Sequence, residues 1–376
     1  DYSFLTRFKL STIGIHNCSF FNVTYMYRLI SCEDPSGDQY LDDVLTFYSN
    51  TITNCYDIDE GIESDTLFSQ YRKNEIINNS FLYKNSNHIT RAFNCRDYNG
   101  CKFIGNKIKN SFVEEGSGIL FSRDGLSPYP LVLSDSIFTN CQGKHGSTIL
   151  IRSINYDITF NNMTFENCKN FDAENGYFIL LDFNYSNAKA NFVNCKFSYL
   201  ETNFINGGSV GLKLNSIEEQ NCTILFENSS FENLFHSNST GGGAIQMSNI
   251  LSNLIIDKCC FLNVSSNGNG GAIYFDSSKF IISISQCTFE EVSSGNYHAI
   301  YINMNSYLTA TISGCYFNDC CPNNKQNTYI LLLNSYDFIF EYNEISFSNP
   351  EQNCRIIDST YLDRHCYRNN LFRNIK

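Results

Sequence analysis

The fold is decided by Asp257-Lys-Cys-Cys-Phe-Leu-Asn-Val264, which returns as Ser285-Gln-Cys-Thr-Phe-Glu-Glu-Val292 and again as Ser313-Gly-Cys-Tyr-Phe-Asn-Asp-Cys320. The matching residues follow one another at a constant interval of 28 positions, as in Cys259, Cys287 and Cys315 and in Phe261, Phe289 and Phe317. A fixed period of this length is typical of a solenoid, in which each repeat packs only on its neighbours.

The apolar residues of one unit show where the chain bends. Ile282 and Ile284 occupy even positions, Cys287 and Phe289 odd ones, and Val292 is even again. Because neighbouring side chains of a strand point to opposite faces, a change of parity requires a corner. The pattern therefore predicts three short strands per turn and about ten to eleven turns, which is a parallel β-helix. Cys259, Cys287, Cys315, Phe261, Phe289 and Phe317 should stack in its core.

A Phe marker recurs along most of the chain, often preceded by Cys and followed by Asn. The markers are Phe81, Phe103, Phe138, Phe165, Phe197, Phe231, Phe261, Phe289, Phe317 and Phe347. An Asn that follows the inward Phe should lie at a corner, since Asn tolerates left-handed backbone angles. We expect one β-helix domain over 1–376, with an irregular acidic insert at about 32–68 and a degenerate end at about 348–376.

The insert carries one hint of a cation site. Alternating carboxylates run from Asp57 to Asp65, as in calcium loops, but the Gly and closing Glu of an EF-hand are out of place. We interpret the run as a solvated acidic loop, and expect no metal and no cofactor.

Composition excludes some partners. The chain has 26 basic and 38 acidic residues, a net charge of −12, which argues against nucleic acid as a partner. No apolar run is long enough to predict a transmembrane segment. Because the chain begins at Asp1 without a signal peptide, we expect a processed form or a segment of a longer product.

Two features favour an extracellular or cell-surface location. The first is the number of cysteines, 17, without CxxC metal spacing. The second is a set of nine Asn-x-Ser/Thr sequons. An Asn-rich chain also produces sequons by chance, so some of the nine are expected to be unmodified. The candidate glycosylation sites are Asn17, Asn22, Asn78, Asn162, Asn184, Asn221, Asn228, Asn238 and Asn263.

The cysteines divide into two predicted groups. Stacked turns lie about 4.8 Å apart, but parallel strands hold their Cβ vectors parallel, which leaves the Cβ atoms too far apart for a disulfide. Cys259, Cys287 and Cys315 should therefore be buried thiols. Irregularly placed cysteines are better disulfide candidates. The candidate pairs are Cys32 with Cys55, Cys95 with Cys101, Cys141 with Cys168, and Cys354 with Cys366.

The repeat resembles a known family. Cys-x-Phe-x-Asn followed by Gly-Gly-Ala-Ile, complete at 242–245 and 270–273, is similar to the repeats of the polymorphic outer membrane proteins of chlamydiae and of related protist surface proteins. Asn stands two residues after Phe here, whereas the bacterial motif usually has three, which favours the eukaryotic relatives. The resemblance implies a right-handed β-helix of the pectin-lyase-like kind on a cell surface, and it supplies no catalytic residues.

These observations lead to a prediction of function. The catalytic sets of β-helix galacturonases are missing, and Asp42-Asp43 stands alone, so we expect no enzyme. The leading hypothesis is an N-glycosylated surface protein with a structural or adhesive role, which could stack end to end with copies of itself into an extracellular filament. The first alternative is an adhesin that binds a host protein or glycan through 34–65 or through the loops after Phe103 and Phe197. The second is a polysaccharide lyase or hydrolase.

Overall fold

The computed structural model describes most of the chain. The described residues are 12–25, 28–32, 44–57, 64–69, 73–83, 90–96, 101–112, 118–122, 130–143, 148–154, 157–170, 178–183, 189–202, 210–214, 222–236, 241–248, 252–277, 281–295, 297–304, 309–320, 328–334, 337–348, 354–358 and 364–373. Within them every element is a β-strand, and no helix is long and apolar enough to cross a bilayer.

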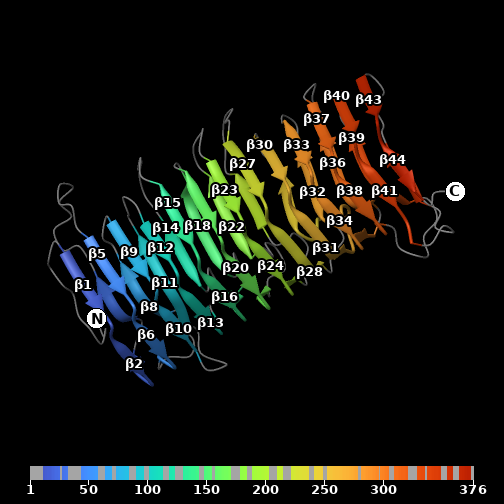
Figure 1. Ribbon diagram of the computed structural model, residues 1–376. Helices are drawn as coiled ribbons and strands as arrows, with labels where there is room; N and C mark the ends of the chain where they lie inside the picture. Colours follow the sequence, from blue (N-terminus) through green and yellow to red (C-terminus); the bar gives the residue numbers. More distant parts are fainter. Residues whose placement is uncertain are drawn as a thin grey trace.

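The strands form parallel sheets that run the length of a rod (Figure 1). The first sheet has 13 strands, one from each turn. They are β1 (Thr12–His16), β5 (Val44–Tyr48), β9 (Lys73–Ile77), β12 (Cys101–Ile104), β15 (Leu131–Ser134), β19 (Ile158–Asn161), β23 (Lys189–Val193), β27 (Cys222–Glu227), β30 (Ser252–Asp257), β33 (Ile282–Ser285), β37 (Thr309–Ser313), β40 (Asp337–Glu341) and β43 (Arg364–Arg368).

The second stack follows one corner later in each turn. Its strands are β2 (Ser19–Phe21), β6 (Thr51–Thr53), β10 (Ser80–Leu82), β13 (Lys107–Lys109), β16 (Ile137–Thr139), β20 (Thr164–Glu166), β24 (Lys196–Ser198), β28 (Ser230–His236), β31 (Cys260–Ser266), β34 (Thr288–Glu290), β38 (Tyr316–Asn318), β41 (Glu344–Ser346) and β44 (Leu371–Arg373). Short strands extend some of these turns, namely β3 (Thr24–Tyr25), β7 (Tyr56–Asp57), β17 (Gln142–Gly143), β21 (Lys169–Asn170), β25 (Glu201–Thr202) and β35 (Ser293–Ser294).

The third sheet has 12 strands and closes the cross-section. It contains β4 (Arg28–Cys32), β8 (Ser64–Ser69), β11 (Thr90–Arg96), β14 (Ile119–Ser122), β18 (Ile149–Ile154), β22 (Ile179–Phe183), β26 (Val210–Leu214), β29 (Ile245–Ser248), β32 (Ile273–Ser277), β36 (Tyr297–Met304), β39 (Thr328–Asn334) and β42 (Cys354–Asp358). The predicted parallel β-helix with three strands per turn is confirmed, and the described turns number more than the ten to eleven expected.

One segment of each turn has a constant length. The inward residue of the second stack always follows the last inward residue of the first sheet by five positions, as in Phe47 and Ile52 or Ile284 and Phe289. Between them lies a first corner whose residue has a positive φ, for example +52° at Gln286. A second corner follows the second stack, with φ of +53° at Glu291. These are the two corners that the parity of the sequence predicts.

The sequence prediction missed or misplaced several turns because Ile replaces the Phe marker in them. Phe103 pairs with Ile76 and Leu133 in the first sheet, so the marker of its turn is Ile108. Ile345, not Phe347, pairs with Phe317 in the second stack.

The two regions that the sequence marks as irregular also contain strands of the rod. The stretch at about 32–68 contains β5, β6 and β8, which belong to one turn. The end at about 348–376 contributes β42, β43 and β44 to the sheets. Ile52 fills the marker column in the first region, whereas Phe372 fills it in the last turn, where Asn370 rather than Cys stands two residues before it.

Like residues stack in the core. The rings of Phe261 and Phe289, and those of Phe289 and Phe317, have centroids 4.8 Å apart and nearly parallel planes. Glycine allows equally close stacking at the Gly-Gly-Ala corner. A Cβ on Gly243 would lie 2.4 Å from the carbonyl oxygen of Gly271 in the next turn, so no larger residue fits there. This contact gives the Gly-Gly-Ala-Ile motif its physical reason.

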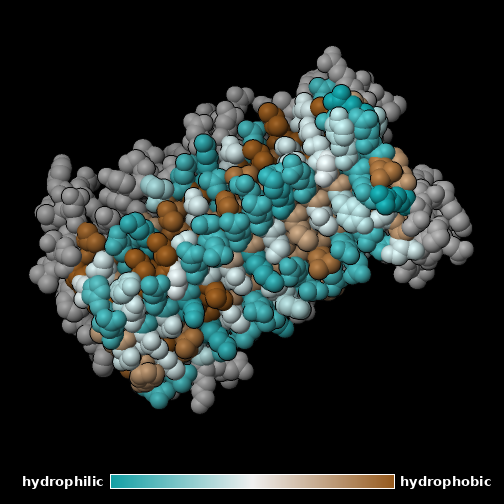
Figure 2. All heavy atoms as spheres, in the orientation of Figure 1, coloured by the Kyte–Doolittle hydropathy of each residue, from teal (hydrophilic) through white to brown (hydrophobic). Residues whose placement is uncertain are grey.

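The outer faces of the sheets differ in burial. On the third sheet, Leu120, Leu150 and Leu180 form a buried cluster separate from the core. On the face shown in Figure 2, apolar side chains form small patches among hydrophilic ones. On this face the exposed surface is thus largely polar, as expected for a rod whose apolar residues point inward.

Candidate functional site

The described sequon asparagines lie at the corners of the rod. Asn17, Asn78, Asn162 and Asn228 occupy the first corner, and Asn22 and Asn263 the second. All six have φ between 48° and 56°, and all are exposed. The fold explains the spacing, because a left-handed corner favours Asn and the Ser or Thr two residues later begins or continues a strand. Asn184 and Asn238 lie outside the described residues, as does Asn221.

Corner amides also bind the turn before. The Nδ2 of Asn162 donates to Asp135 Oδ1 at 2.8 Å, and the Nδ2 of Asn263 donates to Asn233 Oδ1 at 2.8 Å. Only one amide hydrogen is used in each contact, so the other hydrogen on Nδ2 is available for replacement by a glycan. The corners can therefore carry glycans without losing this contact.

Directly after the first corner, one residue per turn points inward. We name this set the inner column, and all but its two terminal members are buried. Its members are Cys18, Asn50, Asn79, Asn106, Ser136, Met163, Cys195, Ser229, Cys259, Cys287, Cys315, Asn343 and Asn370. The sequence prediction recognised its cysteines and missed its asparagines, although Asn-x-Phe or Asn-x-Ile at 79–81, 106–108 and 343–345 was the available signal.

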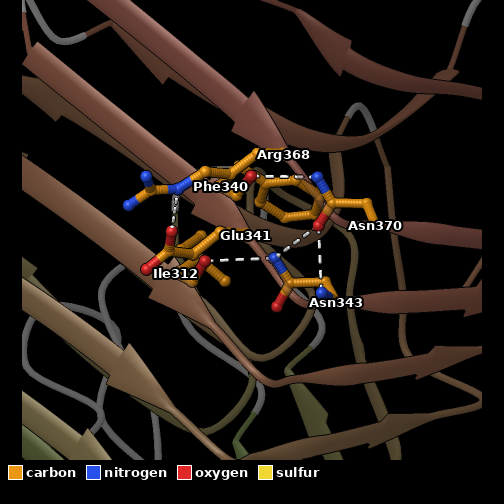
Figure 3. Close-up of polar contacts among 6 residues, drawn as sticks. All are labelled: Ile312, Phe340, Glu341, Asn343, Arg368 and Asn370. Atoms are coloured by element: carbon orange, nitrogen blue, oxygen red, sulfur yellow. Dashed lines mark hydrogen bonds and ion pairs between the residues drawn. The ribbon is translucent and has the colours of Figure 1, made fainter.

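The inner-column asparagines join neighbouring turns through both ends of the amide (Figure 3). The Oδ1 of Asn343 accepts a hydrogen bond from the backbone N–H of Cys315 at 2.8 Å, and its Nδ2 donates to the carbonyl of Ile312 at 3.0 Å. Asn370 repeats both bonds one turn later, with the N–H of Asn343 at 3.0 Å and the carbonyl of Phe340 at 2.9 Å. Arg368 and Glu341 form an ion pair beside them. Each amide therefore satisfies two backbone groups of the preceding turn.

Thiols take the same positions in the middle of the rod. The Sγ atoms of Cys287 and Cys315 donate to the carbonyls of Ile256 and Ile284 at 3.6 and 3.7 Å, which are weaker contacts than those of the amides. A hydrogen bond with Cys287 and burial raise the pKa of the Cys259 thiol, and burial raises the pKa of Cys195 to about 12. Such thiols are protonated and poorly nucleophilic at neutral pH.

The disulfide candidates occupy other columns. Cys141 and Cys168 stack in adjacent turns, since β17 pairs with β21 in register, so they share the parallel geometry that opposes a disulfide. Cys95 and Cys101 are buried in different sheets, and the Sγ of Cys95 accepts from Asn74 Nδ2 at 3.4 Å. The structure holds all four as free thiols and forms neither pair.

The other two candidate pairs stay predictions. The side chains of Cys32 and Cys354 lie outside the described residues, whereas Cys55 is a buried thiol and Cys366 a half-buried one.

The acidic run divides in the structure. Residues 58–63 lie outside the described residues, and so do Asp42-Asp43. Asp65 is buried in β8, where its Oδ1 accepts from Arg91 at 2.8 Å and its Oδ2 from Asn94 at 2.8 Å. Both carboxylate oxygens of Asp65 thus have partners within the third sheet, and its charge is balanced by Arg91. No group of three or more His, Cys, Asp or Glu among the described side chains is arranged to hold a metal ion.

Comparison with known proteins adds no family to this picture, because no protein-family model matches the chain and no curated protein is significantly similar to it.

Proposed function

We propose that this protein is a non-enzymatic, N-glycosylated β-helix of the cell surface or extracellular space, with a structural or adhesive role. The observation that carries the proposal is the position of the six described sequons. Each lies exposed at a corner, on the outer side of a continuous hydrophobic core, and has an amide hydrogen to spare. Glycans at these corners would cover the rod without disturbing the stacked columns.

The competing explanation is that corner asparagines produce sequons by chance, and site-by-site glycopeptide mass spectrometry of the protein from its native source separates the two. Corner asparagines without a sequon, such as Asn140 and Asn167, are internal controls with the same backbone conformation. The proposal expects glycan mass on several of Asn17, Asn78, Asn162 and Asn228 and none on the controls. An unglycosylated chain recovered from the cytosol would contradict it.

A second candidate is an adhesin that binds a host protein or glycan. Several tyrosines on the outside of the rod support it, because tyrosine combines an apolar ring with a hydrogen-bonding hydroxyl and is enriched at contact surfaces. Those more than about a third exposed are Tyr48, Tyr199, Tyr316, Tyr342 and Tyr367. A glycan array and a cell-attachment assay with Tyr199→Ser and Tyr342→Ser test this role. Unchanged attachment, with no array signal for the unsubstituted protein, would remove it.

A further inference from the structure

The last turn of the rod leaves inward-facing residues open to solvent. Tyr367 in β43 and Phe372 in β44 are each 48% exposed, whereas Phe317, in the same column as Phe372, is fully buried. Leu371 is 47% exposed beside them. In Figure 1, β43 and β44 lie at the red end of the stack, opposite β1 and β2 at the blue end. An open strand edge with exposed apolar side chains is a template for another strand.

The hydrogen bonds between turns define what would fit on this end. In most turns the inner-column side chain donates to the carbonyl of the last inward residue of the preceding first-sheet strand, as Asn370 does to Phe340. It also brings a second-stack N–H to the preceding inner-column carbonyl, as Leu371 does to Asn343 at 2.8 Å. A turn placed on β43 and β44 would therefore bring its second-stack N–H to the carbonyl of Asn370, and its inner-column side chain to the level of Tyr367.

The first turn of the same chain supplies both groups at the matching positions. Its inner-column residue is the part-buried Cys18, whose Sγ donates to the carbonyl of His16 in its own turn at 3.3 Å. The interior thiol of Cys287 makes the same contact with Ser285 and a second one with Ile256 of the preceding turn. Ser19 begins β2 at the position that Leu371 has in β44. The polar groups of the two ends are therefore complementary.

The side chains of the two ends match as well. In the same register, Phe20 would stack on Phe372 as the interior phenylalanines stack on one another. Phe21, 59% exposed, would lie next to Arg373, which places a guanidinium against an aromatic ring. Asn17 would face Asn369, and both have the left-handed corner conformation, with φ of +54°. Phe20 and Ile15 are only partly buried, which leaves them area to cover.

We propose that a second copy of this chain docks its β1 and β2 on β43 and β44, so that the columns of the first sheet and of the second stack continue from one molecule to the next. The inference rests on the proposed structural role and names its partner as the protein itself. Such a head-to-tail contact does not close on itself, because each added copy presents the same free end. The product is a straight filament of variable length.

Two end variants test the register. Phe372→Lys places a charge in the contact at the last turn, and Ser19→Pro removes the N–H that would donate to the carbonyl of Asn370. Each variant keeps one functional end. Light scattering and negative-stain images should show wild-type filaments that grow with concentration, and association weakened about tenfold or more in either variant alone.

A mixture of the two variants gives the sharpest outcome. The open last turn of Ser19→Pro should pair with the open first turn of Phe372→Lys, so the mixture should stop at dimers. Tyr199→Lys, 56% exposed at a corner far from both ends, is the matched control and should form filaments. Equal melting temperatures show that the variants are folded.

Wild-type monomers at every concentration, or variants that polymerise like wild type, would overturn the inference. A glycosylated monomer would do so and leave the proposed surface role intact.

Discussion

Amide side chains and thiol side chains occupy equivalent positions of the inner column, on the same backbone conformation. Toward the two ends of the rod several of its residues are asparagines, as at Asn50, Asn79 and Asn343, and farther in several are thiols, as at Cys259 and Cys287. Cys18, Ser136, Met163 and Ser229 fill other turns. The amides accept and donate normal hydrogen bonds to the preceding turn, whereas the thiols make long, weak ones. The comparison teaches that the position accepts several inward side chains, most of which donate to a carbonyl, although Met163 has no donor. It does not require a particular residue.

The largest expected effect on stability is at an inner-column asparagine. Asn79 accepts from the Asn50 N–H at 2.9 Å and donates to the Phe47 carbonyl at 2.8 Å. Asn79→Leu leaves both backbone groups buried without partners, so the free energy of unfolding should fall by about 4 kcal/mol. Denaturant titration measures it. Asn140→Gly, at an outer corner where glycine keeps the positive φ, is the control. An equal loss in the control would show that the inner amide has no special role.

The second effect is the pH dependence of stability that the buried thiols cause and the amides do not. Burial raises the pKa of Cys195 and of Cys320 to about 12, against a usual value of 9.0. The folded state therefore favours the protonated thiol, so this stability is complete below pH 9 and is lost as pH rises from 9 toward 12. At pH 10 each thiol should destabilise the protein by about 1.4 kcal/mol.

The pH effect is measured from unfolding midpoints at pH 8 and pH 10. The free energy of unfolding should fall less between pH 8 and pH 10 in Cys195→Ala than in wild type. In Asn79→Gln it should fall by the same amount as in wild type. An unchanged decline in Cys195→Ala would show that the thiol does not titrate on unfolding.

A smaller effect should follow from deleting one thiol of the stack. Cys287→Ala removes one buried atom and a weak hydrogen bond, so it should cost about 1 kcal/mol, far less than Asn79→Leu. The measurement is the same denaturant titration. A loss of unfolding free energy equal to that of Asn79→Leu would show that the thiol and amide positions of the inner column do not differ.

The smallest effect concerns the corner beside the thiols. Gln286 and Lys258 have φ of +52°, a conformation that Asn adopts more readily than Gln or Lys. Gln286→Gly should stabilise the rod by about 0.5 kcal/mol, whereas Asn162→Gly should change little. Thermal unfolding of the two variants checks this difference. Equal shifts would mean that the middle corners are not strained relative to the asparagine corners.

Sequence reasoning predicted the fold where the columns are filled by recurring residues. Cys259 to Phe317 showed the period, the parity and two corners. The reasoning failed where a different residue meets the same physical need, as with Asn79 for Cys and Ile108 for Phe. Cys141 and Cys168 looked irregular because their spacing of 27 differs from 28, yet register places them in one column. Contact between turns depends on loop lengths that a residue pattern does not reveal.

The constant five-residue step around the first corner has a consequence for chain length. Loops elsewhere absorb all variation, so whole turns are interchangeable units. Deleting residues 259–286 joins Lys258 to Cys287 and removes one period of 28 residues. Every remaining column stays aligned, and the rod shortens by about 4.8 Å. Unequal recombination between such repeats would therefore change the length of the rod by whole turns and preserve its cross-section.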